Sequence, residues 1–253
     1  MPYLSAGMKH QGRKRPRNED NYLAEDKLGL YAVADGVEAE SAGEVASRLA
    51  LELLAEVLQD MNLDEDATPP FEYAQGVPLP ARALKFAVRE VNRKIYDKAR
   101  SDPKLAGMCT TLSAAWFTEG KVYLANVGDS RIYLVRRGQI QQLTHDHTSI
   151  AQGSTSQTPA IDFVEHFSSI SEHELTRAVG VNPDVEVQLA AGTPKSGDLF
   201  ILCTDGLYQE LRDFEIMDLA MANPPEEALK KMIESANQKG GKDNVAAVII
   251  KTS

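Results

Sequence analysis

Apolar and polar positions follow two different periods in the first part of the chain. Residues 28–34 (LGLYAVA) form a short apolar run that stops at an acidic residue, which is typical of a buried strand. Apolar residues then recur at helical spacing over residues 42–58 and again over 81–100, and Ser41 is placed to cap the first of these predicted helices. The intervening residues 60–80 are acidic and rich in proline, which predicts a surface loop.

From Thr110 onward the pattern changes to short strands joined by tight turns. One predicted hairpin turns at Glu119-Gly120 and a second turns at Gly138. Because strands occur in runs and helices in pairs, we expect an α+β fold in which helices cover packed, mainly antiparallel sheets. The remaining segments are predicted as strands at 185–190, 198–203 and 244–251 and as helices at 213–222 and 225–238.

Residues 148–174 differ from both patterns. They are polar, mixed in character and poor in periodicity. We therefore expect a mobile insertion over a functional site rather than a core element. The total length of 253 residues permits one large domain or two small ones.

Composition and charge exclude several classes of protein. The chain is 43% hydrophobic and carries a formal net charge of −10, which opposes binding to nucleic acid or to an anionic membrane surface. Neither a membrane-spanning apolar stretch nor a secretory signal is visible, so we expect a cytoplasmic protein. The two cysteines, Cys109 and Cys203, have no Cys-x-x-Cys partners, which argues against a disulfide scaffold or a thiolate zinc site.

Short acidic motifs are the main candidates for chemistry. Most of them follow an apolar run, and strand ends that converge can bring such carboxylates into one cluster. Clustered carboxylates repel each other unless cations neutralise them, and an all-oxygen ligand set suits Mg²⁺ or Mn²⁺. The motifs are Asn18-Glu19-Asp20, Asp35-Gly36, Gly128-Asp129-Ser130-Arg131, Asp205-Gly206 and Asp243-Asn244.

Each motif also has a simpler interpretation. A lone Asp-Gly or Asp-Asn pair is most often just a turn. The basic residues at 13–17 can be a solvated surface stretch, and we prefer that interpretation for all of them except Arg15. His145 and His147 flank an aspartate, but this spacing is poor evidence for zinc, so we expect them to be structural or to support the site from behind its ligands.

Taken together and in order, the motifs make the chain similar to the metal-dependent serine/threonine protein phosphatases of type 2C, in the compact form that bacteria use. The resemblance runs from about Gly7 to Lys251. It rests on the strings LYAVADG, ESAGEVAS, TTLSAAW, ANVGDSRIYLVRRG, LTHDH, LTRAVG, GDLFILCTDGL and GGKDNVAAVII.

The resemblance implies a four-layer α-β-β-α sandwich with two central sheets. It implies that residues 1–253 form a single catalytic domain, with the segment 148–174 as a mobile flap. The site would lie in a cleft at one end of the two sheets. The family's metal ligands correspond to Glu19, Asp35, the carbonyl of Gly36, Asp205 and Asp243, while Asp129 matches the ligand of a third, weaker ion.

Other matched positions imply the reaction. Arg15 corresponds to the arginine that binds the substrate phosphate, Asp20 stands behind the ligands, and Asn244 orients the site. The implied activity is Mg²⁺- or Mn²⁺-dependent hydrolysis of phosphoserine and phosphothreonine in proteins, by direct attack of a water that bridges two tightly bound ions. The implied partners are phosphoproteins of a bacterial Ser/Thr kinase, and we expect a monomer.

One segment departs from the family pattern. The family usually has glycines and often a histidine after Asp-Gly, whereas this chain reads Val37-Glu38-Ala39-Glu40, and Cys109 replaces a glycine before the paired threonines. This departure leaves a second hypothesis open, a weakly active pseudophosphatase that serves as a regulatory binding module. A third hypothesis, a two-metal phosphodiesterase or nuclease, is disfavoured by the acidic charge balance.

Overall fold

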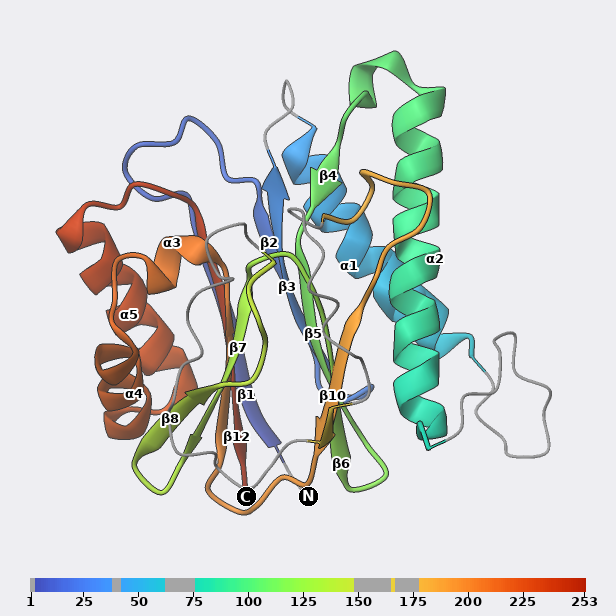
Figure 1. Ribbon diagram of the computed structural model, residues 1–253. Helices are drawn as coiled ribbons and strands as arrows, with labels where there is room; N and C mark the ends of the chain where they lie inside the picture. Colours follow the sequence, from blue (N-terminus) through green and yellow to red (C-terminus); the bar gives the residue numbers. More distant parts are fainter. Residues whose placement is uncertain (1–2, 38–41, 62–75, 148–164, 167–177) are drawn as a thin grey trace.

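The computed structural model describes residues 3–37, 42–61, 76–147, 165–166 and 178–253. Two β-sheets pack face to face, and helices cover the outer face of each (Figure 1). The four layers therefore run helix, sheet, sheet, helix, and the predicted α+β sandwich is confirmed. Within these residues, no helix combines the length and apolar composition that crossing a membrane requires.

The first sheet has five strands in the order β1-β12-β11-β7-β8 and is antiparallel throughout. Its outer face packs against the C-terminal helices through the buried cluster that includes Ile201, Ile249 and Met232. The elements of this half are β1 (Tyr3–His10), β7 (Arg131–Arg136), β8 (Gln139–Gln142), β11 (Leu199–Cys203), α3 (Asp205–Tyr208), α4 (Asp213–Ala222), α5 (Pro225–Lys239) and β12 (Val245–Thr252).

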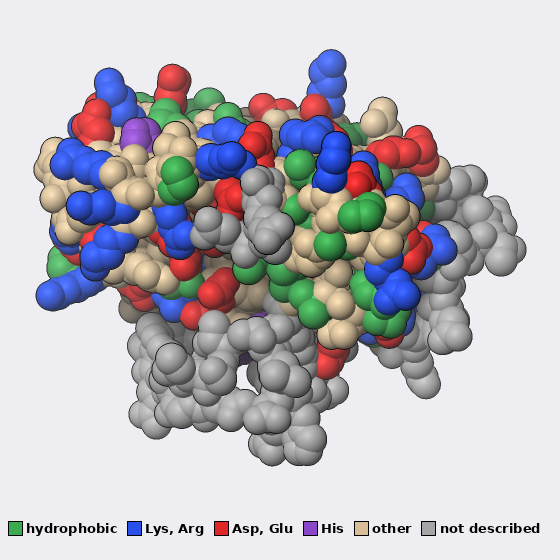
Figure 2. Space-filling view, turned by 90° about the horizontal axis from the view of Figure 1, so that it is seen from above, with side chains coloured by type: hydrophobic (Ala, Val, Ile, Leu, Met, Phe, Trp, Pro, Cys, Tyr) green, Lys and Arg blue, Asp and Glu red, His purple; other side chains and the backbone are tan. Residues whose placement is uncertain are grey.

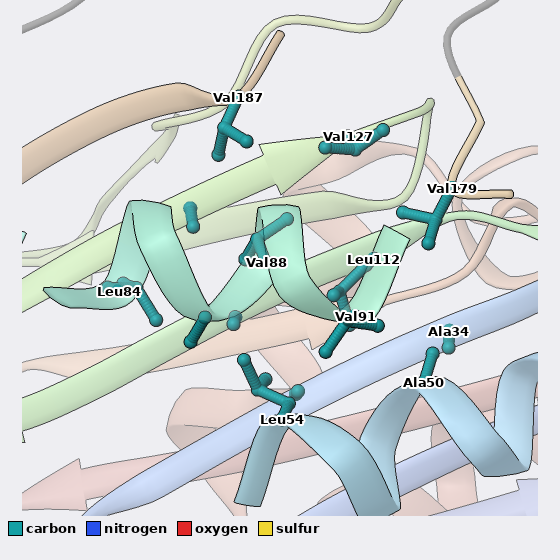
Figure 3. Packing of buried hydrophobic residues seen from close by; sticks show 14 of the residues in the cluster. Ala34, Ala50, Leu54, Leu84, Val88, Val91, Leu112, Val127, Val179 and Val187 are labelled. Atoms are coloured by element: carbon teal, nitrogen blue, oxygen red, sulfur yellow. The ribbon is translucent and has the colours of Figure 1, made fainter. Parts of the chain in front are cut away.

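The second sheet runs β2-β3-β5-β6-β10-β9, with β4 beside β3. Its outer face packs against two long helices, and Figure 3 shows Leu54, Leu84 and Val88 filling the space between them and the sheet. The elements are β2 (Asp20–Glu25), β3 (Leu30–Val37), α1 (Gly43–Gln59), α2 (Leu79–Ser101), the short 3₁₀ turn η1 (Pro103–Leu105), β4 (Cys109–Thr110), β5 (Leu112–Thr118), β6 (Lys121–Val127), β9 (Glu165–His166) and β10 (Gln188–Gly192).

Both predicted hairpins are present. Glu119 and Gly120 have φ values of 53° and 73° between β5 and β6, and Arg137 and Gly138 have 54° and 73° between β7 and β8. Two consecutive positive φ angles match the turns that fit the twist of paired strands. The two inner sheet faces meet through the buried cluster that includes Tyr31 and Phe200.

Several predicted boundaries were wrong. The strand predicted at 185–190 begins at Gln188, and Leu79 and Pro80 belong to α2 rather than to the preceding loop, because proline is tolerated in the first turn of a helix. Strands β1 and β2 and the four-residue helix α3 were missed altogether. Of the predicted insertion, only residues 165–166 are described, and they pair with β10 at the sheet edge.

Candidate active site

A cleft of about 620 Å³ lies at one end of the two sheets. Every residue proposed from the sequence as a metal ligand or phosphate-binding group lines it. Asp20 is buried beside them rather than on the surface of the cleft. The lining residues are Arg15, Pro16, Arg17, Glu19, Asp35, Gly36, Val37, Thr111, Asp129, Asp205, Asp243 and Asn244.

The ends of several strands bring the acidic residues together. Asp20 begins β2 and is the direct cross-strand partner of Asp35 in β3. Asp205 opens α3 just after β11, Asp243 precedes β12, and Asp129 lies in the turn between β6 and β7. Both sheets therefore contribute carboxylates to one cleft.

Paired threonines hold the backbone of Asp35. The Asp35 amide donates to Thr111 Oγ1 (2.9 Å), and Thr110 Oγ1 donates to the Asp35 carbonyl (2.8 Å). Thr111 Oγ1 also lies 2.7 Å from Ser130 Oγ, next to Asp129 in the sequence. The same hydroxyl thus links β3 to the turn that carries Asp129.

Asp20 lies behind the cleft and joins the two sheets. Its side chain is only 1% exposed, and Thr204 Oγ1 donates to its Oδ2 (2.7 Å). Asp35 lies close enough to Asp20 and Asp205 for their charges to raise the pKa of its carboxyl group.

Burial and mutual repulsion shift the titration of the cluster. Burial raises the pKa of Asp20 to about 7 and that of Asp205 to about 6, and neighbouring carboxylate charges add to both shifts. The pKa of Asp35 is raised well above its usual range, first by burial and then by the charges of Asp20 and Asp205. Burial also raises the pKa of Asp129. A cation bound here would relieve this repulsion.

One carboxylate oxygen of the cleft is left without a partner. Asp205 Oδ1 is buried and accepts no hydrogen bond, although its Oδ2 accepts one from Gln209 Nε2 (2.7 Å). A buried, unpaired carboxylate oxygen is costly unless a ligand completes its environment. The oxygen donors and this orphaned atom fit a hard divalent cation.

The carboxylates also have protein partners in this arrangement. Arg15 Nη2 pairs with Asp243 Oδ2 at 2.7 Å. Among the described residues, no group of three or more His, Cys, Asp or Glu side chains is arranged to hold a metal ion. Cation binding would therefore require Asp243 to release Arg15, and it would compete with protons for the carboxylates whose pKa values are raised.

Asn244 fixes the loop that carries Arg15 and Glu19. Its Nδ2 donates to the carbonyls of Gln11 and Arg17, both at 2.7 Å. Its Oδ1 accepts a hydrogen bond from the Glu19 amide (2.8 Å). A single buried amide thus satisfies three backbone groups and holds this loop against the start of β12.

Gly36 is required by close packing rather than by its φ angle. A Cβ atom at this position would lie 2.2 Å from the carbonyl oxygen of Gly43, at the beginning of α1. A Cβ on Gly43 would in turn lie 2.9 Å from the carboxyl group of Glu19. The paired glycines let α1 approach β3 and place its N-terminus beside Glu19.

Comparison with known proteins identifies the family. The family described as protein phosphatase 2C matches residues 6–249 of this sequence. The chain belongs to this family. The serine/threonine phosphatase stp of Listeria innocua is 32% identical over 244 residues, which cover 95% of this chain and 92% of that relative. The serine/threonine protein phosphatase PstP of Mycobacterium tuberculosis is 33% identical over 244 residues, which cover 96% of this chain and 44% of that longer protein.

A solved structure of this family shares the fold. The catalytic domain of the serine/threonine protein phosphatase PstP, in complex with two manganese ions, is 29% identical to this chain, with a TM-score of 0.76. The match covers 98% of this chain and 97% of that one. The resemblance inferred from the motifs and the predicted enzyme class, a serine/threonine phosphatase, are thereby confirmed.

Some contacts of this phosphatase site were not predicted. The hydroxyl of Tyr208 donates to the Asp129 carbonyl (3.0 Å), and the Tyr208 ring lies under the guanidinium of Arg131, 3.6 Å from its centroid. Arg131 is also paired with Asp146 at 2.7 Å. The Gly-Asp-Ser-Arg motif marked Arg131, but no sequence signal marked Tyr208 as its partner.

Two further expectations concern flanking residues. His147 Nδ1 accepts a hydrogen bond from the Gly128 amide (3.0 Å), as expected for a structural histidine beside the Asp129 turn. Val37, at the departure from the phosphatase pattern, is 45% exposed and pairs with Cys109 across β3 and β4. Glu38, Ala39 and Glu40 lie outside the described residues.

Proposed function

We propose that this chain is a Mg²⁺- or Mn²⁺-dependent protein phosphatase that hydrolyses phosphoserine and phosphothreonine. The observation that carries the proposal is Asp205 Oδ1, a buried carboxylate oxygen without a hydrogen-bond partner in a cleft lined by acidic residues. Family membership and the manganese-bound relative support it.

The chain's own residues divide the work. Glu19, Asp35, Asp205 and Asp243, with the carbonyl of Gly36, would hold two cations, and Asp129 would hold a third more weakly. Bound divalent ions lower the pKa of a coordinated water and neutralise charge on a phosphoryl group, so no covalent phosphoenzyme is needed.

Arg15 is the proposed phosphate-binding residue. Its side chain already binds the carboxylate of Asp243 and is 42% exposed at the cleft. A guanidinium presents parallel N–H donors that match two phosphate oxygens as well as two carboxylate oxygens. Arg15 can therefore exchange Asp243 for a substrate phosphate when Asp243 turns to a cation.

The proposed function also concerns the domain, the location and the substrates of the enzyme. We infer one catalytic domain over residues 1–253 that acts as a cytoplasmic monomer on phosphoproteins made by a bacterial Ser/Thr kinase. The acidic net charge of −10 supports a protein rather than a nucleic acid as the substrate.

The test compares substrates and cations on the purified protein. We expect hydrolysis of an aryl phosphate and of phosphothreonine peptides only when Mn²⁺ or Mg²⁺ is added. Hydrolysis that persists in excess EDTA would refute the metal mechanism. Calorimetric Mn²⁺ binding without measurable hydrolysis would instead favour the pseudophosphatase that the Val37-Glu38-Ala39 departure suggests, and plasmid nicking would favour the nuclease.

A further inference from the structure

The loop between β1 and β2 reverses the local charge of an acidic protein. It carries Arg13, Lys14, Arg15 and Arg17 within five positions, whereas the whole chain has a net charge of −10. Arg15 is paired with Asp243. The other three are exposed and form no ion pair with any residue in the described part of the chain, and we call them the basic rim (Arg13, Lys14 and Arg17).

The basic rim is held in place. The carbonyl of Arg17 accepts a hydrogen bond from Asn244 Nδ2 (2.7 Å), and the amide of Arg13 donates to the Gly241 carbonyl (2.7 Å). The Arg13 stem packs on Gly241 so closely that a Cβ there would lie 3.0 Å from Arg13 Cγ. A loop whose backbone is anchored in this way loses less conformational freedom when its side chains bind an anion.

The position of the rim points to the substrate. Arg17 and Pro16 line the same cleft as the carboxylates, and Arg13 packs against Gly241, two residues before Asp243. Figure 2 looks onto this end of the molecule and shows Lys and Arg side chains on both sides of a few central Asp and Glu side chains. A peptide whose phosphate enters the cleft would therefore pass beside these cations.

We propose that the basic rim binds acidic side chains that flank the phosphorylated residue of a protein substrate. The inference rests on the proposed phosphatase function and adds a substrate class to it. Like charges repel one another, and a flanking carboxylate relieves this repulsion while it steers the peptide toward the cleft. A nucleic acid is the weaker candidate because the rest of the protein is acidic.

The test uses matched phosphothreonine peptides with Asp and Glu, or with Ala, at the positions around the phosphothreonine. We expect kcat/KM to be about tenfold higher for the acidic peptide, since exposed charge pairs are weak singly and sum over a few contacts. The preference should fall when ionic strength rises from about 0.05 M to about 0.5 M. Equal kcat/KM for both peptides would overturn the proposal.

The variant Arg13→Gln/Lys14→Gln assigns the preference to the rim. Neither residue lines the cleft, so aryl-phosphate hydrolysis should stay unchanged while most of the acidic-peptide preference is lost. Lys27→Gln/Arg137→Gln is the control, because it removes the same charge from turns that follow β2 and β7 at the other end of the strands. Equal effects of the two double variants would show that the net charge of the protein, and not the basic rim, causes the preference for the acidic peptide.

The two proposals fail in different ways. No hydrolysis of any phosphate ester by the wild-type protein would refute the phosphatase function itself. Normal aryl-phosphate hydrolysis without a flank preference would refute only the role of the rim. A single-stranded oligonucleotide that inhibits more strongly than the acidic peptide product would assign the rim to nucleic acid instead.

Discussion

The hydroxyl of Tyr208 donates a hydrogen bond to the backbone carbonyl of Asp129 (3.0 Å). Tyr208 ends the short helix α3 that Asp205 begins. The bond therefore links the helix that carries Asp205 to the turn that carries Asp129. The ring of Tyr208 also stacks on Arg131, whose other contacts are with Asp146 and Tyr133. This cluster fixes the turn that carries Asp129, the residue proposed to hold a third ion.

Tyr208→Phe should loosen the Asp129 turn without abolishing the tight binding of metal ions in the cleft. The substitution removes one hydrogen bond, worth about 1 kcal/mol, and retains the ring that stacks on Arg131. We expect the Mn²⁺ concentration for half-maximal turnover to rise by about fivefold, since 1.4 kcal/mol is a factor of about ten. Calorimetry should show unchanged tight binding, and Tyr22→Phe, at an exposed tyrosine, is the control.

Asp129→Ala should separate the weak ion from the tight pair. Asp129 lies in the turn between β6 and β7, whereas the ligands proposed for the tight pair lie on other segments. We expect kcat to fall and the metal requirement to rise, with tight binding retained in a calorimetric titration. Loss of tight binding would place Asp129 in the central pair.

Asp35→Asn, Asp205→Asn and Asp243→Asn should each reduce turnover by about a thousandfold or more, because each removes a negatively charged metal ligand. The metal-free fold should survive. Burial and neighbouring charges raise the pKa values of Asp35 and Asp205, so a neutral amide removes repulsion there. Thermal unfolding in EDTA should therefore show no loss of Tm for the variants at these two positions.

Arg15→Ala should mainly raise KM for small aryl phosphates, with some loss in kcat, because it removes the proposed phosphate-binding group. Arg17→Ala, in the same loop and also at the cleft, should change aryl-phosphate kinetics little. Steady-state kinetics on both variants makes the comparison. Similar behaviour of the two, or a larger effect at Arg17, would show that the phosphate-binding residue was assigned wrongly.

The sequence predicted contacts of short range better than those of long range. The hairpins follow from glycines in turns, and the helices from apolar spacing that the chain shows within a few residues. Strand β1 was missed because it is an edge strand without clear alternation, its pattern running from half-buried to exposed. Strand β2 was missed because it is short and begins with Asp20, which is polar although it is buried. A polar residue at this position is more typical of a loop than of a strand.

In the candidate site, too, local features were predicted and long-range contacts were not. The acidic motifs mark their own carboxylates, because small and polar residues after an apolar run are visible in the sequence. The bond from Thr204 to Asp20 spans 184 positions and that from Tyr208 to Asp129 spans 79. Pairings of this kind depend on how the two sheets stack, and no local pattern encodes them.

The metal-free protein should lose stability as the pH rises through the weakly acidic range. Burial raises the pKa of Asp20 from 3.8 to about 7 and that of Asp205 to about 6. Between these limits the folded protein holds more protons than the unfolded chain, so the free energy of unfolding falls with increasing pH. Urea denaturation in EDTA at several pH values measures this slope.

Asp20→Asn isolates the contribution of the cluster. The amide keeps an acceptor for Thr204 Oγ1 and cannot ionise, so the stability of this variant should fall less between pH 4 and about 7. Exposed carboxylates such as Asp184, whose pKa Arg89 lowers, act in the opposite direction but equally in both proteins. Saturating Mn²⁺ should reverse the wild-type trend above pH 6, because a cation binds the deprotonated carboxylates of the folded state. A wild-type slope identical to that of Asp20→Asn would show that Asp20 does not titrate with a raised pKa in the folded protein.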